Sequence, residues 1–141
     1  MANPPYDPKK ITPDLYDNRR LVTGEIVAIL HVTFTDRKLK LIDTKSRAII
    51  KNEIHELMIT DEGNAAPGGS ADRVSAIAFF EVTQGGLIVT GDEVSISGKP
   101  LGKLVGYDMN HMPNHMNVLV KAPSIDEPFL VVGDEIVFKR P

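Results

Sequence analysis

From residue 21 onward, apolar and polar residues alternate in patterns typical of short β-strands. Residues 21–32 and 74–82 are rich in β-branched side chains and too apolar for fully exposed strands. Residues 38–41 alternate between lysine and leucine, as expected of a half-buried return strand. Further short strands are predicted at 87–90, 93–97, 103–107, 117–121 and 135–139. Because glycine and proline separate them, the pattern predicts a small antiparallel β-barrel, or a closed sandwich, over residues 21–141.

Two segments depart from this pattern. Within residues 44–58, apolar side chains between Ile50 and Met58 recur at three- and four-residue steps, and Thr44 is suited to cap a helix. One helix is therefore predicted here, although the same stretch also alternates weakly, as a strand would. Residues 1–20 contain four prolines, which fix φ and lack a backbone donor, so an extended N-terminal arm is predicted. Such an arm lies over the domain or reaches a neighbouring subunit, and a frayed terminus is the alternative.

One short pattern occurs twice. In residues 88–96 and 130–138, apolar residues lead into a Gly-Asp pair that a further strand-like segment follows. Glycine supplies the backbone conformation of a tight turn, and the adjacent acid can accept backbone N–H bonds there. These pairs are interpreted as barrel corners, and a ring of acids for a metal or substrate is the alternative.

The amino-acid composition excludes some classes of function and favours others. The chain has 141 residues, a net charge of −3, no cysteine and no tryptophan, so disulfides and thiolate-ligated metal centres are excluded. Clustered positive charge is scarce, so nucleic-acid binding is not expected. No apolar run is long enough to span a membrane and the N-terminus lacks the order of a secretory signal, so a soluble cytoplasmic protein is predicted. Apolar strands and a Met-rich loop favour self-association.

Residues 107–117 concentrate the chemistry-bearing side chains. This segment contains two of the four histidines, three asparagines, three methionines and an aspartate. A plain connection between strands needs only a turn residue or two, so the excess of imidazole, carboxylate and amide groups is unusual. The candidate catalytic residues are Asp108, His111 and His115, and the candidate ligand-binding residues are Asn110, Asn114, Asn117 and Arg73.

Three interpretations of this segment compete. In the first, His111, His115 and Asp108 bind a divalent metal, because imidazole and carboxylate are its usual ligands. In the second, one histidine acts as general acid–base, Asp108 orients it, and the asparagines hold a small polar substrate. In the third, the side chains satisfy the loop backbone and form a subunit contact.

Three residues outside this segment are further candidates for a functional or structural role. Arg73 follows a Gly-Gly-Ser loop whose backbone N–H groups could hold an anion, and a mobile surface loop is the alternative. His55 is interpreted as a solvent-exposed residue of the predicted helix, and His31 as a hydrogen-bonded interior or edge residue. The sequence therefore predicts a β-barrel binding or assembly protein with its site at 107–117. The alternative is a small lyase, isomerase or hydrolase that acts on a polar metabolite.

Overall fold

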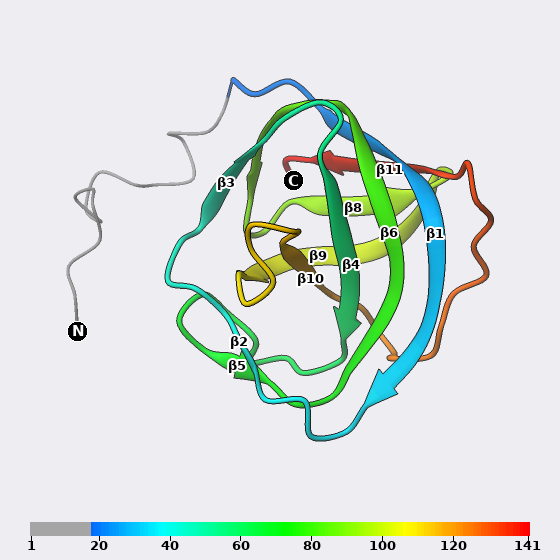
Figure 1. Cartoon of the computed structure of the whole chain (residues 1–141). Helices are drawn as coiled ribbons and strands as arrows, with labels where there is room; N and C mark the ends of the chain where they lie inside the picture. The colour runs from blue at the N-terminus through cyan, green and yellow to red at the C-terminus, as the bar shows by residue number, and fades with distance from the viewer. Residues whose placement is uncertain (1–17) are drawn as a thin grey trace.

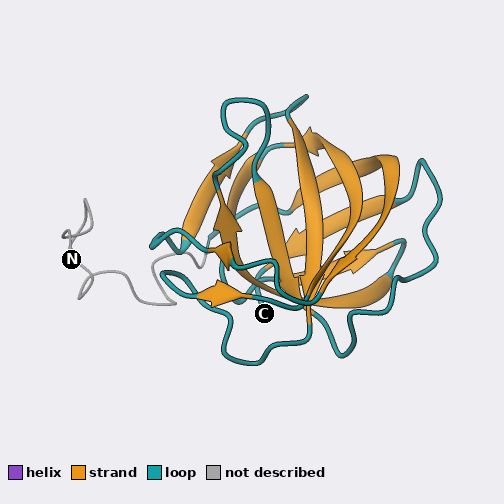
Figure 2. Cartoon of the chain, turned by 60° about the horizontal axis from the view of Figure 1, so that its bottom comes forward, coloured by secondary structure: helices purple, strands orange, loops and turns teal. Residues whose placement is uncertain are grey.

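The computed structural model describes residues 18–141, so nearly all of the predicted arm at 1–20 lies outside the described residues. Within the described part the chain forms strands and no helix, which confirms the mainly β class (Figure 2). No described segment is a helix that could cross a membrane. The strands are β1 (Val22–Phe34), β2 (Leu39–Lys40), β3 (Ser46–Ile49), β4 (Ile54–Thr60), β5 (Ser70–Ala71), β6 (Val74–Gln84), β7 (Gly86–Val89), β8 (Glu93–Ile96), β9 (Lys99–Asp108), β10 (Asn117–Lys121) and β11 (Glu135–Lys139).

Seven strands form a single sheet that closes on itself. Their order is β1-β11-β8-β9-β10-β4-β6, and β1 also pairs with β6, so the sheet is a closed barrel (Figure 1). Neighbouring strands are antiparallel except β10 and β4, which run parallel. The remaining strands form two small sheets, β2 with β5 and β3 with β7.

The predicted helix at 44–58 is wrong. The segment contains β3, a turn and the first five of the seven residues of β4. Successive residues of β4 are buried on opposite faces: Leu57 belongs to one core cluster and Met58 to the other. A strand that is buried on both faces places apolar residues next to one another, as at Leu57 and Met58. Ile50 and Ile54, which completed the helical spacing, are 67% and 46% exposed and belong to no common apolar face. Asn52, with φ of 79°, occupies the turn before β4.

The two core clusters lie on the two sides of the barrel wall. The larger contains residues from all seven barrel strands, including Phe80, Val118 and Tyr107, and therefore fills the interior. The smaller lies outside, where the β2–β5 sheet brings Leu39 against Leu119 and its neighbours. Burial on both faces fixes the register, since a slip of one residue would exchange the two sets of side chains.

The repeated Gly-Asp pairs are turns with identical hydrogen bonds. Gly91 and Gly133 have φ of 96° and 102°, values that favour glycine. The Asp92 carboxylate accepts the Val89 N–H at 2.9 Å, and the Asp134 carboxylate accepts the Val131 N–H at the same distance. The corner interpretation therefore holds at both positions.

Candidate functional site

The segment that carries the candidate residues connects β9 to β10. It covers residues 109–116 and lies beside the start of β4 and β10 (Figure 1). Three short-range bonds turn its backbone: Met112 N–H donates to the Met109 carbonyl at 3.1 Å, and the N–H groups of Asn114 and His115 donate to the His111 carbonyl at 2.9 and 3.2 Å. We call it the 109–116 loop.

Beneath this loop, four side chains form a row across four neighbouring strands. Asn117 of β10 is paired with Asp108 of β9 on one side and with Glu56 of β4 on the other. Glu56 is in turn paired with Phe79 of β6. The residues beside them along each strand face the barrel interior, namely Tyr107, Val118, Leu57 and Phe80. Because side chains alternate along a strand, Asp108, Asn117, Glu56 and Phe79 share the outer face, and we call them the outer row.

The Asp108 side chain is hydrogen-bonded to the backbone of the 109–116 loop. Its carboxylate accepts the Asn110 N–H at 2.6 Å and lies 3.4 Å from the Asn110 side-chain nitrogen. This arrangement is an Asx turn. Asp108 thus orients the chain as it leaves β9, and the predicted role of orienting a histidine has no support in its contacts.

His115 lies over the outer row. Its Nε2 is 3.3 Å from a Glu56 carboxylate oxygen, and its Nδ1 is 2.6 Å from the Asn114 side-chain oxygen. The ring meets Phe79 edge-on at 5.1 Å and stacks on His111 at 5.0 Å. The loop therefore brings the two predicted histidines together, and it adds Glu56, which sequence reasoning missed.

The arrangement does not form the predicted metal centre. Among residues 18–141, no group of three or more histidine and acidic side chains is placed to hold a metal ion. Asp108 bonds with Asn110, while His115 faces Glu56. The stacked imidazoles present their faces to one another, whereas metal ligation requires their nitrogens to converge on one point.

Asn117 is the most unusual member of the outer row. Its side chain is buried, with 1% of the residue exposed, and neither Oδ1 nor Nδ2 has a hydrogen-bond partner among the described residues. A buried amide without partners costs about 1–3 kcal/mol. Most buried polar groups in folded proteins are hydrogen-bonded. The unpaired side chain of Asn117 therefore does not stabilise the folded protein by itself.

His55 lies on the opposite side of the β4 wall and anchors the loop. It is 5% exposed, not the solvent-exposed residue predicted, and its ring contacts Phe80 in the barrel core. Its Nδ1 accepts the Met116 N–H at 3.1 Å. Burial lowers the pKa of His55, and the nearby Glu53 carboxylate opposes that shift. The ring is therefore neutral near pH 7, with its proton on Nε2, because Nδ1 acts as the acceptor.

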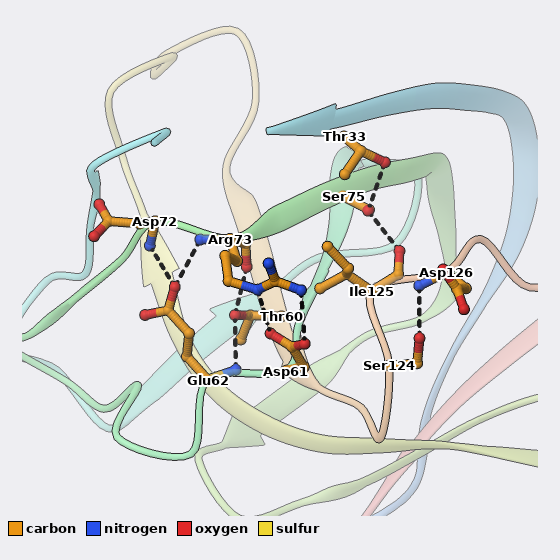
Figure 3. A network of polar contacts seen from close by, with 10 residues as sticks. All are labelled: Thr33, Thr60, Asp61, Glu62, Asp72, Arg73, Ser75, Ser124, Ile125 and Asp126. Carbon is orange, nitrogen blue, oxygen red and sulfur yellow. Dashed lines mark hydrogen bonds and ion pairs between the residues drawn. The ribbon is translucent and has the colours of Figure 1, made fainter. Parts of the chain in front are cut away.

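Arg73 lies far from the loop, at the end of β4 that holds Thr60 (Figure 3). Its guanidinium donates two hydrogen bonds of 3.2 Å to Asp61, and its backbone N–H donates to Glu62 at 2.6 Å. Its carbonyl accepts the Thr60 hydroxyl at 2.6 Å. Arg73 thus stabilises the chain around β5, and it does not join the predicted ligand-binding residues. His31 is an exposed residue whose Nδ1 is 2.6 Å from Glu127.

Comparison with known protein families gives one match. The model of a family of unknown function, DUF6917, matches residues 16–139. The chain belongs to this family. No curated protein and no solved structure matches it.

The whole candidate site lies within the part of the chain that the DUF6917 model matches. The match extends from before β1 to the end of β11, so it includes the outer row, the 109–116 loop and His55. The family match therefore covers the whole barrel, including the residues on both faces of β4, and it assigns no activity to them.

Proposed function

We propose that this protein is a β-barrel binding module that holds a small, neutral polar molecule between the outer row and the 109–116 loop. The observation that carries the proposal is the buried Asn117 amide, whose donor and acceptor both lack partners among the described residues. A ligand with a carboxamide or neighbouring hydroxyl groups would satisfy both atoms at once.

The charges around Asn117 favour a neutral ligand over an anion. Its two neighbours in the row are the carboxylates Asp108 and Glu56. An anionic ligand would be repelled there, whereas a hydroxyl or amide N–H can donate to Glu56. The ligand is reached when residues 110–114, which are exposed, move away from the row.

Acetamide and glycerol are suitable minimal probes, and acetate is the charged control. In NMR titrations of the wild type we expect saturable shifts of the Asn117 side-chain amide and the His115 ring with acetamide or glycerol, and weaker shifts with acetate. The Asn117→Leu variant should fold and lose this binding, because leucine fills the space without donor or acceptor. Ser97→Ala, on the distant β8–β9 turn, is the matched control and should bind as the wild type does. Equal binding by wild type and Asn117→Leu would refute the proposal, as would no binding of any neutral probe.

The contact between Glu56 and His115 favours a second candidate, an enzyme that moves a proton on its ligand. Asn114 orients the His115 ring through Nδ1, and Glu56 lies 3.3 Å from Nε2. An oriented imidazole beside a carboxylate is suited to general acid–base catalysis. This would make the protein a small lyase, isomerase or hydrolase.

Dihydroxyacetone in D2O separates the two candidates. An enzyme would exchange the carbon-bound protons of this hydroxyketone for deuterium, and Glu56→Gln would lose the exchange while binding persists. A pure binding module would shift the resonances of the outer row without exchange. Self-association stays a prediction, which sedimentation velocity over a range of protein concentrations tests.

A further inference from the structure

Two hydrogen bonds hold Met116, the last residue of the 109–116 loop, at the start of β4. Its carbonyl accepts the Glu56 N–H at 3.0 Å, and its N–H donates to His55 Nδ1 at 3.1 Å. The Met116 side chain is buried in the interior core. Of these contacts, the one to Nδ1 involves a titratable group, so it is the contact that pH can change.

The position of Met116 determines where the residues of the candidate site lie. His115 and Asn117 flank it along the chain, and both lie beside Glu56. Nε2 of His115 is 3.3 Å from the Glu56 carboxylate, and Asn117 is paired with Glu56 across the strands. Among the described residues, the backbone N–H bonds of the loop before Met116 are made within the loop or to the Asp108 side chain. The anchor at Met116 therefore holds the end of the loop that carries His115.

The bond to Met116 requires a neutral His55 ring. Nδ1 accepts the N–H only while it carries no proton, whereas a protonated imidazole has donors at both nitrogens. Burial lowers the pKa of His55, and the nearby Glu53 carboxylate opposes this shift. The positive charges of Arg47 and of a protonated His115 add to the lowering. The ring is therefore neutral near pH 7, and it gains its second proton at a pH below its ordinary pKa of 6.5.

Protonation of His55 strengthens one of its contacts and removes another. Glu53 Oε1 lies 3.5 Å from Nε2, so a protonated ring has an acid beside it that stabilises its charge. On the other side of the ring, the new proton on Nδ1 faces the Met116 N–H, and two donors then oppose each other. Because a buried N–H that loses its acceptor is unfavourable, protonation weakens the anchor of the loop.

We propose that His55 is a positioning residue of the binding site: its neutral ring holds the 109–116 loop over the outer row, and protonation of Nδ1 releases the loop. The regulation of ligand binding that follows rests on the function proposed for the outer row, since the ligand is held between that row and the loop. Ligand affinity is therefore highest when the His55 ring is neutral, and it falls as the ring becomes protonated.

The first test follows the loop by NMR in the folded wild-type chain, without ligand, between about pH 5 and 8. We expect the hydrogen-exchange protection of the Met116 amide to fall about tenfold or more as the His55 ring is protonated, with the same midpoint. The exposed His31 ring is the internal control, and its protonation should not change this protection. The proposal is overturned if the protection of Met116 stays constant through the His55 titration, or if it follows the His111 or His115 ring instead.

Two variants of His55 separate a positioning role from a merely structural one. His55→Asn has an amide oxygen close to the position of Nδ1 and does not titrate, so the Met116 amide should stay protected over the whole pH range. His55→Gln extends its amide toward the position of Nε2 instead, so the loop should be loosely held at every pH. If folded His55→Asn loses protection at low pH as the wild type does, the proposal is overturned.

A parallel titration with acetamide distinguishes this proposal from the function proposed for the outer row. If the loop responds to pH but acetamide binds at no pH, the binding function fails and the role of His55 in holding the loop stands. If acetamide binds equally well to the neutral and the protonated His55 forms, the binding function stands and the regulation is overturned. Asn117→Leu should lose acetamide binding and keep the pH response of the Met116 amide, because it leaves the anchor intact.

Discussion

The two ends of β4 hold polar clusters of opposite kinds. Around Thr60 and Arg73, the polar groups that make up the network are paired with one another (Figure 3). Beneath the 109–116 loop, both polar atoms of the buried Asn117 side chain lack hydrogen-bond partners among the described residues. Both clusters contain acidic side chains, Asp61 and Glu62 at one end and Glu56 and Asp108 at the other, so the presence of acids does not separate them. The two clusters differ in whether their polar groups are hydrogen-bonded. A paired network stabilises the fold, whereas unpaired polar groups are suited to a ligand.

The strongest test of this comparison exchanges one buried polar side chain for an apolar one at each end. Thr60→Val should destabilise the protein by about 1–3 kcal/mol, because it leaves the Arg73 carbonyl and the Glu62 N–H without the hydroxyl that joins them. Asn117→Leu should leave the free energy of unfolding unchanged or increase it, since it removes two unpartnered atoms. Urea unfolding of both variants measures the difference. If Asn117→Leu is as destabilising as Thr60→Val, the two clusters are alike.

An intermediate effect is expected from pH at the loop end. Because burial lowers the pKa of His55 below 6.5, the unfolded chain binds more protons than the folded one between the two pKa values. This contribution to stability is complete above pH 6.5 and is lost as the pH falls toward the folded-state pKa. His55→Asn keeps an acceptor for the Met116 N–H but does not titrate, so its stability should fall less steeply than that of the wild type. Unfolding series between about pH 5 and 8 test this, and parallel slopes would contradict it.

The smallest effect is expected from the ion pair at the paired end. The hydrogen bond from Arg73 lowers the pKa of Asp61, so its contribution is present above pH 3.8 and is lost as the pH falls through the folded-state pKa. Solvent screens this surface pair, so Asp61→Asn should change stability little at pH 7. Its stability should also depend less on salt than that of the wild type. Thermal unfolding at low and high salt is the measurement, with Asp36→Asn, in a longer and more exposed pair, as control.

Prediction from sequence succeeded where a residue depends on its immediate neighbours. The Gly-Asp corners were identified because their hydrogen bonds span three residues. The 107–117 segment was singled out by composition, and its two histidines do stack. The helix at 44–58 was wrong because its spacing joined Ile50 and Ile54, which are exposed, to Leu57 and Met58, which distant segments bury on opposite faces of β4. Arg73 was wrongly grouped with the loop because the pairing of β4 with β6 places it beside Asp61 and Glu62, at the far end of β4.

The sequence by itself determined the strands, their corners and the segment with unusual chemistry, since these follow from periodicity and turn residues. Only the tertiary structure decided which side chains meet. Glu56 reaches His115, and Asn117 lies between two carboxylates, because β10 pairs with both β4 and β9. Whether a buried polar group has a hydrogen-bond partner depends on strands that are distant in sequence. The unpaired polar atoms are what distinguish the candidate site from the paired network at the other end of β4.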